Sequence, residues 1–298
     1  MQIRSFIFML YVLLLAKPVN AQSFDQLNNL PGNSVQVYYS TGFKERASNI
    51  ANRVDNAMVY YQQLLDFRPT VNFLVLDTSD WSKYTSFPVY GMPHYSNDNT
   101  LVVAAVDNPF WKSFIPPLDQ LPADLRSTIQ EVYKNDKGEI SMQAFFDLLA
   151  LHELGHAFHF QGGLNMQRKW LQELFVNILL HTYIAENEPA ALPALSLFPN
   201  MVVGSGSQEY KYTSLKDIED RYDEIGKQHP KNYGWYQCRW HLAAASIYDS
   251  GGKPVPGKLW QALKARPGKM DDEQLAVLLS AVNKTLGDVM KNWDKDTK

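Results

Sequence analysis

The stretch "LALHELGHAFHF", from Leu149 to Phe160, sets the expected fold because it reads as the end of a buried helix. From about Ser141 the apolar residues recur at helical spacing, and Gly162 and Gly163 follow as a stop signal. Three histidines and one glutamate interrupt this apolar run. Burying such side chains without partners costs free energy, so the sequence predicts that something binds them.

The spacing of these polar residues predicts a metal site. His152 and His156 lie one helical turn apart on one face, where two imidazoles can bind one cation. Glu153 lies about 100° further round the helix, where it can reach a water on the metal. This His-Glu-x-x-His arrangement is typical of two zinc ligands and a general base. Gly155 costs about 1 kcal/mol against alanine in mid-helix, so we expect it to permit close packing beneath the site.

A catalytic zinc ion usually has three protein ligands, and Glu173 in "WLQELFVN" is the predicted third. It lies early in the next expected helix among strongly apolar neighbours, where a metal-bound carboxylate is favoured over a solvated one. Asn177 follows one turn later and is expected to orient a ligand histidine through its free ring nitrogen. His159 is an alternative ligand, but a straight helix would strain to wrap three ligands around one ion. We therefore expect His159 to be a supporting or core histidine.

The segments H-E-L-G-H (152–156) and W-L-Q-E (170–173) together resemble the gluzincin, or peptidase-MA-like, zinc metallopeptidases. The likeness to the aminopeptidase N and thermolysin types is distant, and the G-A-M-E-N segment of the aminopeptidases is absent. The resemblance implies a zincin-like fold and hydrolysis by a zinc-activated water, with Glu153 as the general base. It also implies that "NTLVVAAV" (99–106) is the sheet edge with which an extended substrate pairs.

In the aminopeptidase relatives, a tyrosine near the start of a helix that ends in Gly-Gly stabilises the oxyanion. Matching Gly251 and Gly252 to that end places Tyr236 on the tyrosine. Tyr236 is therefore the predicted oxyanion donor by resemblance. Tyr233, one turn earlier, and His241 remain alternatives.

Strands are expected to crowd the first third of the chain and helices the rest. The expected strands are "SVQVYYS" (34–40), "TVNFLVLD" (70–77) and "TLVVAAV" (100–106). The expected helices cover 43–67, 123–135, 141–160, 167–186, 233–252 and the C-terminal segment. Two irregular segments are expected. The first is a loop at 78–99. The second is a long connection at 187–232 with at most one helix, and this connection is expected to cover the cleft.

This order predicts an α+β fold, with a mixed-sheet upper lobe packed on a mainly helical lower lobe and an active-site cleft between them. We expect residues 22–163 to form the upper lobe, ending in the motif helix. Residues 164–298 would form the lower lobe and carry the third zinc ligand.

The first 21 residues look like a cleavable secretory signal. A cation at Arg4 precedes an apolar run, and small residues at Val19 and Ala21 fit the signal-peptidase pattern. No later stretch is apolar for long enough to predict a membrane span. Cys238 is the only cysteine, so no internal disulfide can form, and its apolar surroundings predict a buried thiol. An exported chain of this size without disulfides is typical of a bacterial periplasmic or extracellular protein.

The composition is that of an ordinary globular protein, with 45% hydrophobic and 20% charged residues. The formal net charge is −3 and no basic face stands out, so nucleic acid is not an expected partner. The favoured interpretation is an exported zinc metallopeptidase acting on a peptide or protein substrate. The alternatives are a zinc hydrolase of a non-peptide amide or ester, and a non-catalytic binding protein on a peptidase-like fold.

Overall fold

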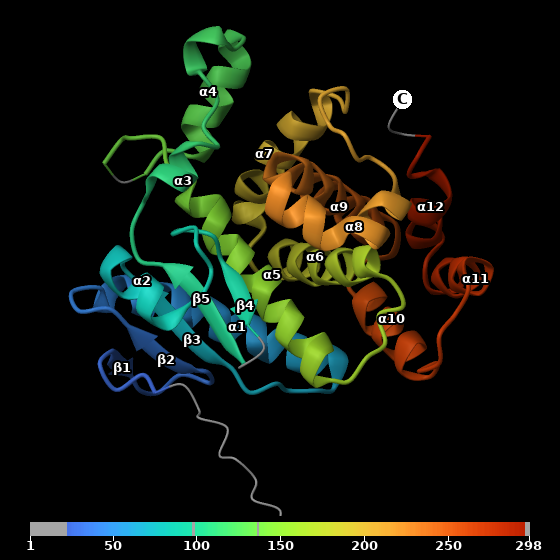
Figure 1. Cartoon of the computed structure of the whole chain (residues 1–298), viewed down its shortest axis with the longest axis horizontal. Coiled ribbons are helices and arrows are strands. Elements are labelled where there is room, and N and C mark those ends of the chain that lie inside the picture. The colour runs from blue at the N-terminus through green and yellow to red at the C-terminus, as the bar shows by residue number, and fades with distance from the viewer. Residues whose placement is uncertain (1–22, 97–98, 136, 296–298) are drawn as a thin grey trace, which may run out of the picture.

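The computed structural model describes residues 23–96, 99–135 and 137–295 (Figure 1). The predicted signal peptide, residues 1–21, lies outside the described residues. Within them the chain is α+β, with a small mixed sheet in the first part and helices in the rest. The predicted α+β class is therefore confirmed.

Among the described residues, five strands form one sheet in the order β1-β2-β3-β5-β4. They are β1 (Asn28–Leu30), β2 (Gln36–Tyr39), β3 (Asn72–Leu76), β4 (His94–Ser96) and β5 (Thr100–Ala104). The central strands β2, β3 and β5 are parallel, and β1 and β4 join the two edges antiparallel. The central strands are those expected from sequence, and the unbroken apolar runs of β3 and β5 suit a sheet that is covered on both faces.

The sheet edge differs from the one implied by the resemblance. Strand β5, within "NTLVVAAV", pairs with β3 on one side and β4 on the other, so it is an interior strand. The edge is β4, which lies in the segment 78–99 expected to be loop. That segment also contains the helix α2 (Thr78–Tyr84). Strand β4 has only three residues and directly follows Pro93, so it is too short to show a periodicity in the sequence.

Helices make up most of the rest of the described chain. Besides α2 they are α1 (Lys44–Leu65), α3 (Pro109–Lys112), α4 (Ala123–Val132), α5 (Gln143–Gln161), α6 (Lys169–Asn187), α7 (Leu192–Gly204), α8 (Leu215–Gln228), α9 (Pro230–Gly251), α10 (Pro254–Lys264), α11 (Asp272–Val282) and α12 (Lys284–Asn292), with short 3-10 turns at Leu118–Gln120 and Pro189–Ala191. None of the described helices combines the length and the apolar character needed to cross a membrane.

The expectation of at most one helix in residues 187–232 is wrong, because both α7 and α8 lie there. The prolines of this segment suggested an irregular chain. Pro193 instead occupies the first turn of α7, where a backbone N–H would have no partner within the helix. Helix α7 then continues through Pro199. Helix α8 corresponds to the one helix expected, and Ser214 begins it with a capping box.

Helix α5 joins the sheet to the helical part of the protein. It contacts β4, β5 and α1 on one side and α6 and α7 on the other (Figure 1). Alternate residues of β3 and β5 face two different apolar cores, as strand geometry requires. The larger core runs from the sheet through α1 and α5 to the C-terminal helices. Most of α5 is therefore buried, which explains why apolar residues occur on every side of it.

Two glycines set the close approach of α5 to its neighbours. A Cβ on Gly162, which follows α5, would collide with Trp260, and Gly163 then adopts φ +66° as the chain turns toward α6. A Cβ on Gly155 would lie 3.0 Å from the Cβ of Val176 on α6. The expectation that Gly155 permits close packing is confirmed. Helix α6 therefore runs directly against the histidine-bearing face of α5.

Candidate metal centre

His152 and His156 project from successive turns of α5 toward α6. Both are buried, and their Nε2 atoms lie 3.2 Å apart. With Glu153 they form a group whose ligand atoms all lie within 4.8 Å of one another. These three residues could hold a metal ion.

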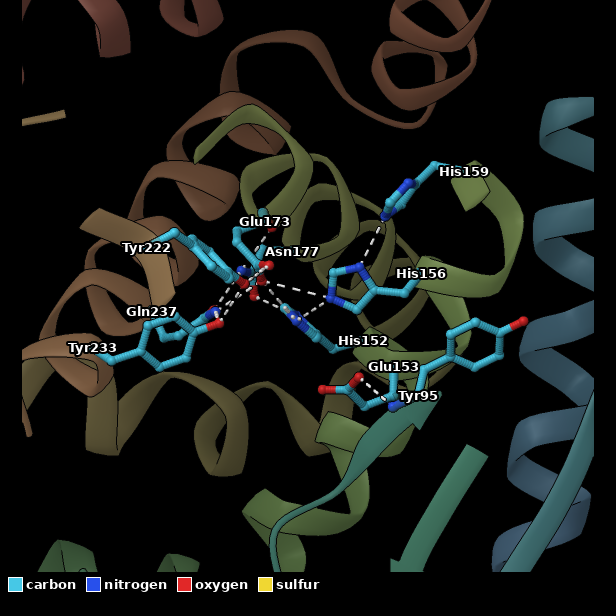
Figure 2. Close-up of polar contacts among 10 residues, drawn as sticks. All are labelled: Tyr95, His152, Glu153, His156, His159, Glu173, Asn177, Tyr222, Tyr233 and Gln237. Carbon is cyan, nitrogen blue, oxygen red and sulfur yellow. Dashed lines mark hydrogen bonds and ion pairs between the residues drawn. The ribbon is translucent and has the colours of Figure 1, made fainter. Parts of the chain in front are cut away.

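Glu173 reaches the same point from α6. Its Oε2 lies 3.3 Å from His152 Nε2 and 3.6 Å from His156 Nε2, and its side chain is almost fully buried. Two ring nitrogens and one carboxylate oxygen thus converge between the two helices (Figure 2). The structure brings together the three side chains that the sequence predicts as ligands.

The second ring nitrogen of each histidine has its own partner. His152 Nδ1 lies 3.3 Å from Asn177 Oδ1, and His156 Nδ1 lies 2.9 Å from His159 Nε2. The Asn177 oxygen can only accept, so it favours the tautomer of His152 with the proton on Nδ1. Burial lowers the pKa of His159 to about 2, and His156 acts in the same direction, so His159 is neutral. Both contacts leave Nε2 of the two α5 histidines directed at Glu173, as Figure 2 shows. Asn177 and His159 thus lie where supporting residues are expected.

A hydrogen-bonded network holds the Glu173 carboxylate from the side opposite the histidines (Figure 2). Tyr222 of α8 donates to Oε1 at 2.6 Å, and Gln237 of α9 donates to Oε2 at 2.8 Å. The Tyr233 hydroxyl lies 3.0 Å from that of Tyr222 and accepts from Gln237 Nε2 at 2.8 Å. Asn177 Nδ2 closes the network by donating to Gln237 Oε1 at 3.2 Å. Both oxygens of the carboxylate are therefore fixed by neutral donors.

The charges around Glu173 follow from burial and from the histidines. Burial alone would raise the pKa of Glu173, but His156 and His152 hold it well below its usual value, so the group is a carboxylate. Burial and the nearby Glu173 raise the pKa of Tyr222 and of Tyr233 well above the ordinary value. Both phenols therefore keep their protons and act as donors.

Glu153 lies on the sheet side of the cluster, where it is only partly buried. The backbone N–H of Tyr95, in the edge strand β4, donates to Glu153 Oε2 at 3.0 Å. Burial raises the pKa of Glu153 to about 7, and Glu173 acts in the same direction, while His152 and the Tyr95 N–H lower it. A carboxyl group with a pKa near 7 can both accept and release a proton at neutral pH.

The structure separates the three candidates for an oxyanion donor. Tyr236, the predicted donor, is fully buried, donates to the carbonyl oxygen of Ser214 and stacks on Trp293, so it is not brought into the cluster. Tyr233 belongs to the network around Glu173. The ring of His241 lies 6.5 Å from that of His152, and burial lowers the pKa of His241 to about 3. Of the two tyrosines, Tyr233 is therefore the one beside the site. Residues 233 and 236 lie about 60° apart around α9, and the Tyr236 side chain points to Ser214 and Trp293 instead of Glu173.

Sequence reasoning missed Tyr222, Gln237 and Tyr95. Gln237 follows Tyr233 by one helical turn, so the spacing along α9 offered a signal for it. Tyr222 reaches Glu173 across 49 residues of chain, and Tyr95 acts through its backbone, so no local pattern marks either one.

The arrangement can do two things chemically. Its buried histidines and carboxylates can hold a metal ion, and Glu153 can exchange a proton beside it. No protein-family model matches the chain, and no curated protein matches it.

Proposed function

We propose that this protein is a zinc-dependent metallopeptidase of the gluzincin type, in which His152, His156 and Glu173 bind the metal. The observation that carries the proposal is the spacing of the three ligand atoms. Tetrahedral zinc ligands at about 2.0–2.1 Å lie about 3.3 Å from one another. The three distances here are 3.2, 3.3 and 3.6 Å.

The partners of the ligand atoms support the same assignment. A ligand histidine normally donates its other ring N–H to a neighbouring acceptor, and Asn177 and His159 are placed to accept. Glu153 also lies near both histidines, but it is less buried than Glu173 and is bound by the N–H of Tyr95. We therefore assign Glu173 as the third ligand and Glu153 as the general base.

The chemistry divides among these residues. When bound, zinc supplies Lewis-acid activation of a water and of the substrate carbonyl. Glu153 accepts a proton from the attacking water and passes it to the amine that leaves, so atoms and charge balance over hydrolysis of one peptide bond. Tyr233 keeps its phenol proton, which it donates to the Tyr222 hydroxyl in the structure. It is our candidate donor to the substrate oxygen if that proton turns toward the negative charge that develops there.

The substrate class and the location of the protein extend the proposal. The edge strand β4 lies beside Glu153, and an extended peptide can bind to a sheet edge through its backbone. We propose that the fold is zincin-like, with a peptide or protein as the substrate. We further propose that the protein acts in the periplasm or outside the cell, because its first 21 residues have the pattern of a secretory signal.

The test combines metal analysis with digestion of a peptide library by the purified chain and its variants. Glu173→Gln is expected to lose zinc, whereas Glu186→Gln, an exposed position on the same helix, is expected to keep it. Glu153→Gln is expected to bind zinc but to digest at most about one-hundredth as fast, as expected for loss of a general base.

Each outcome decides a separate assignment. Normal zinc content in Glu173→Gln would show that the third ligand is wrong. Unchanged digestion by Glu153→Gln would overturn the general-base role. Hydrolysis of amide or ester substrates with no cleavage of any peptide would favour a non-peptide hydrolase.

A further inference from the structure

Phe160, in the last turn of α5, presents its ring at the surface beside the metal centre. It is 51% exposed, although α5 is otherwise largely buried. The ring stacks on His156 with centroids 5.9 Å apart and an interplanar angle of 28°. On another side it lies nearly parallel to the ring of Tyr95, at 6.3 Å and 11°.

Tyr95 is held in place by several groups. Its hydroxyl accepts from Gln161 Nε2 at 2.8 Å and donates to Asn99 Oδ1 at 3.1 Å. The Gln161 side chain is itself fixed, because it bonds both the N–H and the carbonyl of Thr70. Tyr95 is therefore held in place before any substrate binds, which lowers the entropy that binding would cost.

The pair touches both chemical components of the site. Phe160 lies against His156, a proposed ligand, and the backbone of Tyr95 binds Glu153, the proposed base. Aromatic rings interact over centroid separations of about 4.5–7 Å, so the exposed face of Phe160 is available to an aromatic side chain that binds beside His156. Ligand sites are lined largely by apolar and aromatic side chains, and the exposed ring of Phe160 offers such a surface beside His156.

We propose that Phe160 and Tyr95 form the subsite for an aromatic or large aliphatic side chain of the substrate, next to the bond that is hydrolysed. The inference rests on the proposed peptidase function and names the substrate class. Phe160 supplies the open ring surface, and Tyr95 fixes the orientation of that ring.

The first experiment measures binding without turnover. Zinc-loaded Glu153→Gln is titrated with capped hexapeptides in which one phenylalanine moves along an alanine background. We expect the phenylalanine in one position to bind about tenfold more tightly than alanine. Phe160→Ala in the same protein should abolish that difference. Val277→Ala, which truncates another exposed apolar side chain on α11, should preserve it.

The second experiment digests the same peptides with the chain that retains Glu153. Cleavage should occur at a fixed position relative to the phenylalanine, and Phe160→Ala should raise KM more than it lowers kcat. Cleavage without regard to phenylalanine would overturn the subsite and leave the proposed function standing. Phenylalanine-dependent binding that Phe160→Ala abolishes, without any cleavage, would support the subsite and reject the peptidase function. Equal binding of all peptides would also overturn the subsite.

Discussion

The hydroxyl of Tyr222 donates a 2.6 Å hydrogen bond to Oε1 of Glu173, so a side chain of α8 contacts the proposed third ligand directly. The helical path of α8 is broken at Arg221, immediately before this tyrosine, with φ −125° and ψ 24°. The contact fixes one carboxylate oxygen and leaves Oε2 directed at the two histidines. A segment that the sequence suggests as a cover for the site therefore takes part in shaping it.

Replacing Tyr222 with phenylalanine should weaken metal binding. The change removes the donor to Oε1 and lets the carboxylate rotate, so we expect zinc affinity to fall about 10- to 100-fold. Competition with a chromophoric chelator measures this affinity. Tyr248→Phe is the matched control, since it removes another phenol–carboxylate hydrogen bond, to Glu186, between α9 and α6. Equal zinc affinity in the two variants would mean that the Tyr222 contact does not position the ligand.

Replacing Gly155 with alanine should destabilise the protein, although alanine favours helix. The new Cβ would lie 3.0 Å from both Cβ and Cγ1 of the buried Val176, so α5 and α6 would have to move apart. Overpacking of this kind costs about 1–3 kcal/mol, which exceeds the helix-propensity gain of about 1 kcal/mol. Urea denaturation of the metal-free chain measures the change. Gly226→Ala in α8, where a Cβ meets nothing within 4 Å, should instead stabilise. Stabilisation by both substitutions would show that α5 and α6 are not in close contact at Gly155.

His241 should make the metal-free chain sensitive to mild acid. Burial lowers its pKa to about 3, with His152 and His181 acting in the same direction, whereas an unfolded histidine titrates near 6.5. Between these values the unfolded state binds more protons. The contribution of neutral His241 to the free energy of unfolding is therefore fully present above a pH of about 6.5. It falls as the pH drops below that value, by about 2 kcal/mol at pH 5.

Urea unfolding at pH 7.5 and pH 5 tests the role of His241. His241→Phe keeps a ring of similar size and removes the titrating group, so its stability should fall less on acidification than that of the parent chain. Identical losses in the two proteins would show that His241 does not bind an additional proton on unfolding.

The parts of the structure that the sequence predicts depend on short-range periodicity. The His152–His156 spacing fixes both proposed ligands on one face of α5, and the glycines after that helix allow α6 to return alongside it. Glu173 could be predicted because a carboxylate among apolar residues needs a partner. These inferences need only helix geometry and the cost of burying charge.

The parts that the sequence misses depend on long-range contacts or on backbone groups. The edge strand β4 forms because β5 lies beside it, and a segment of three residues is too short for its sequence pattern to predict a strand. The resemblance assigns Tyr236 from its distance to Gly251 and Gly252 along the chain, and that distance does not determine which side chains of α9 reach Glu173. Tyr222 could not be found, because its partner lies on another helix at a distance that no local pattern encodes.

The two tyrosines of α9 should differ in what their loss affects. Tyr236→Phe removes a 2.7 Å hydrogen bond to the carbonyl of Ser214 at the start of α8, so we expect a loss of about 1–2 kcal/mol in stability and little change in kcat. Tyr233→Phe removes the proposed donor to the developing oxyanion, so kcat should fall about 100- to 1,000-fold with a small change in KM. Both measurements are made at saturating zinc, because Tyr233 also contacts Tyr222 and Gln237, which hold Glu173. The reverse result, with kcat lost in Tyr236→Phe and kept in Tyr233→Phe, would return the oxyanion role to Tyr236 and require α9 to turn during catalysis.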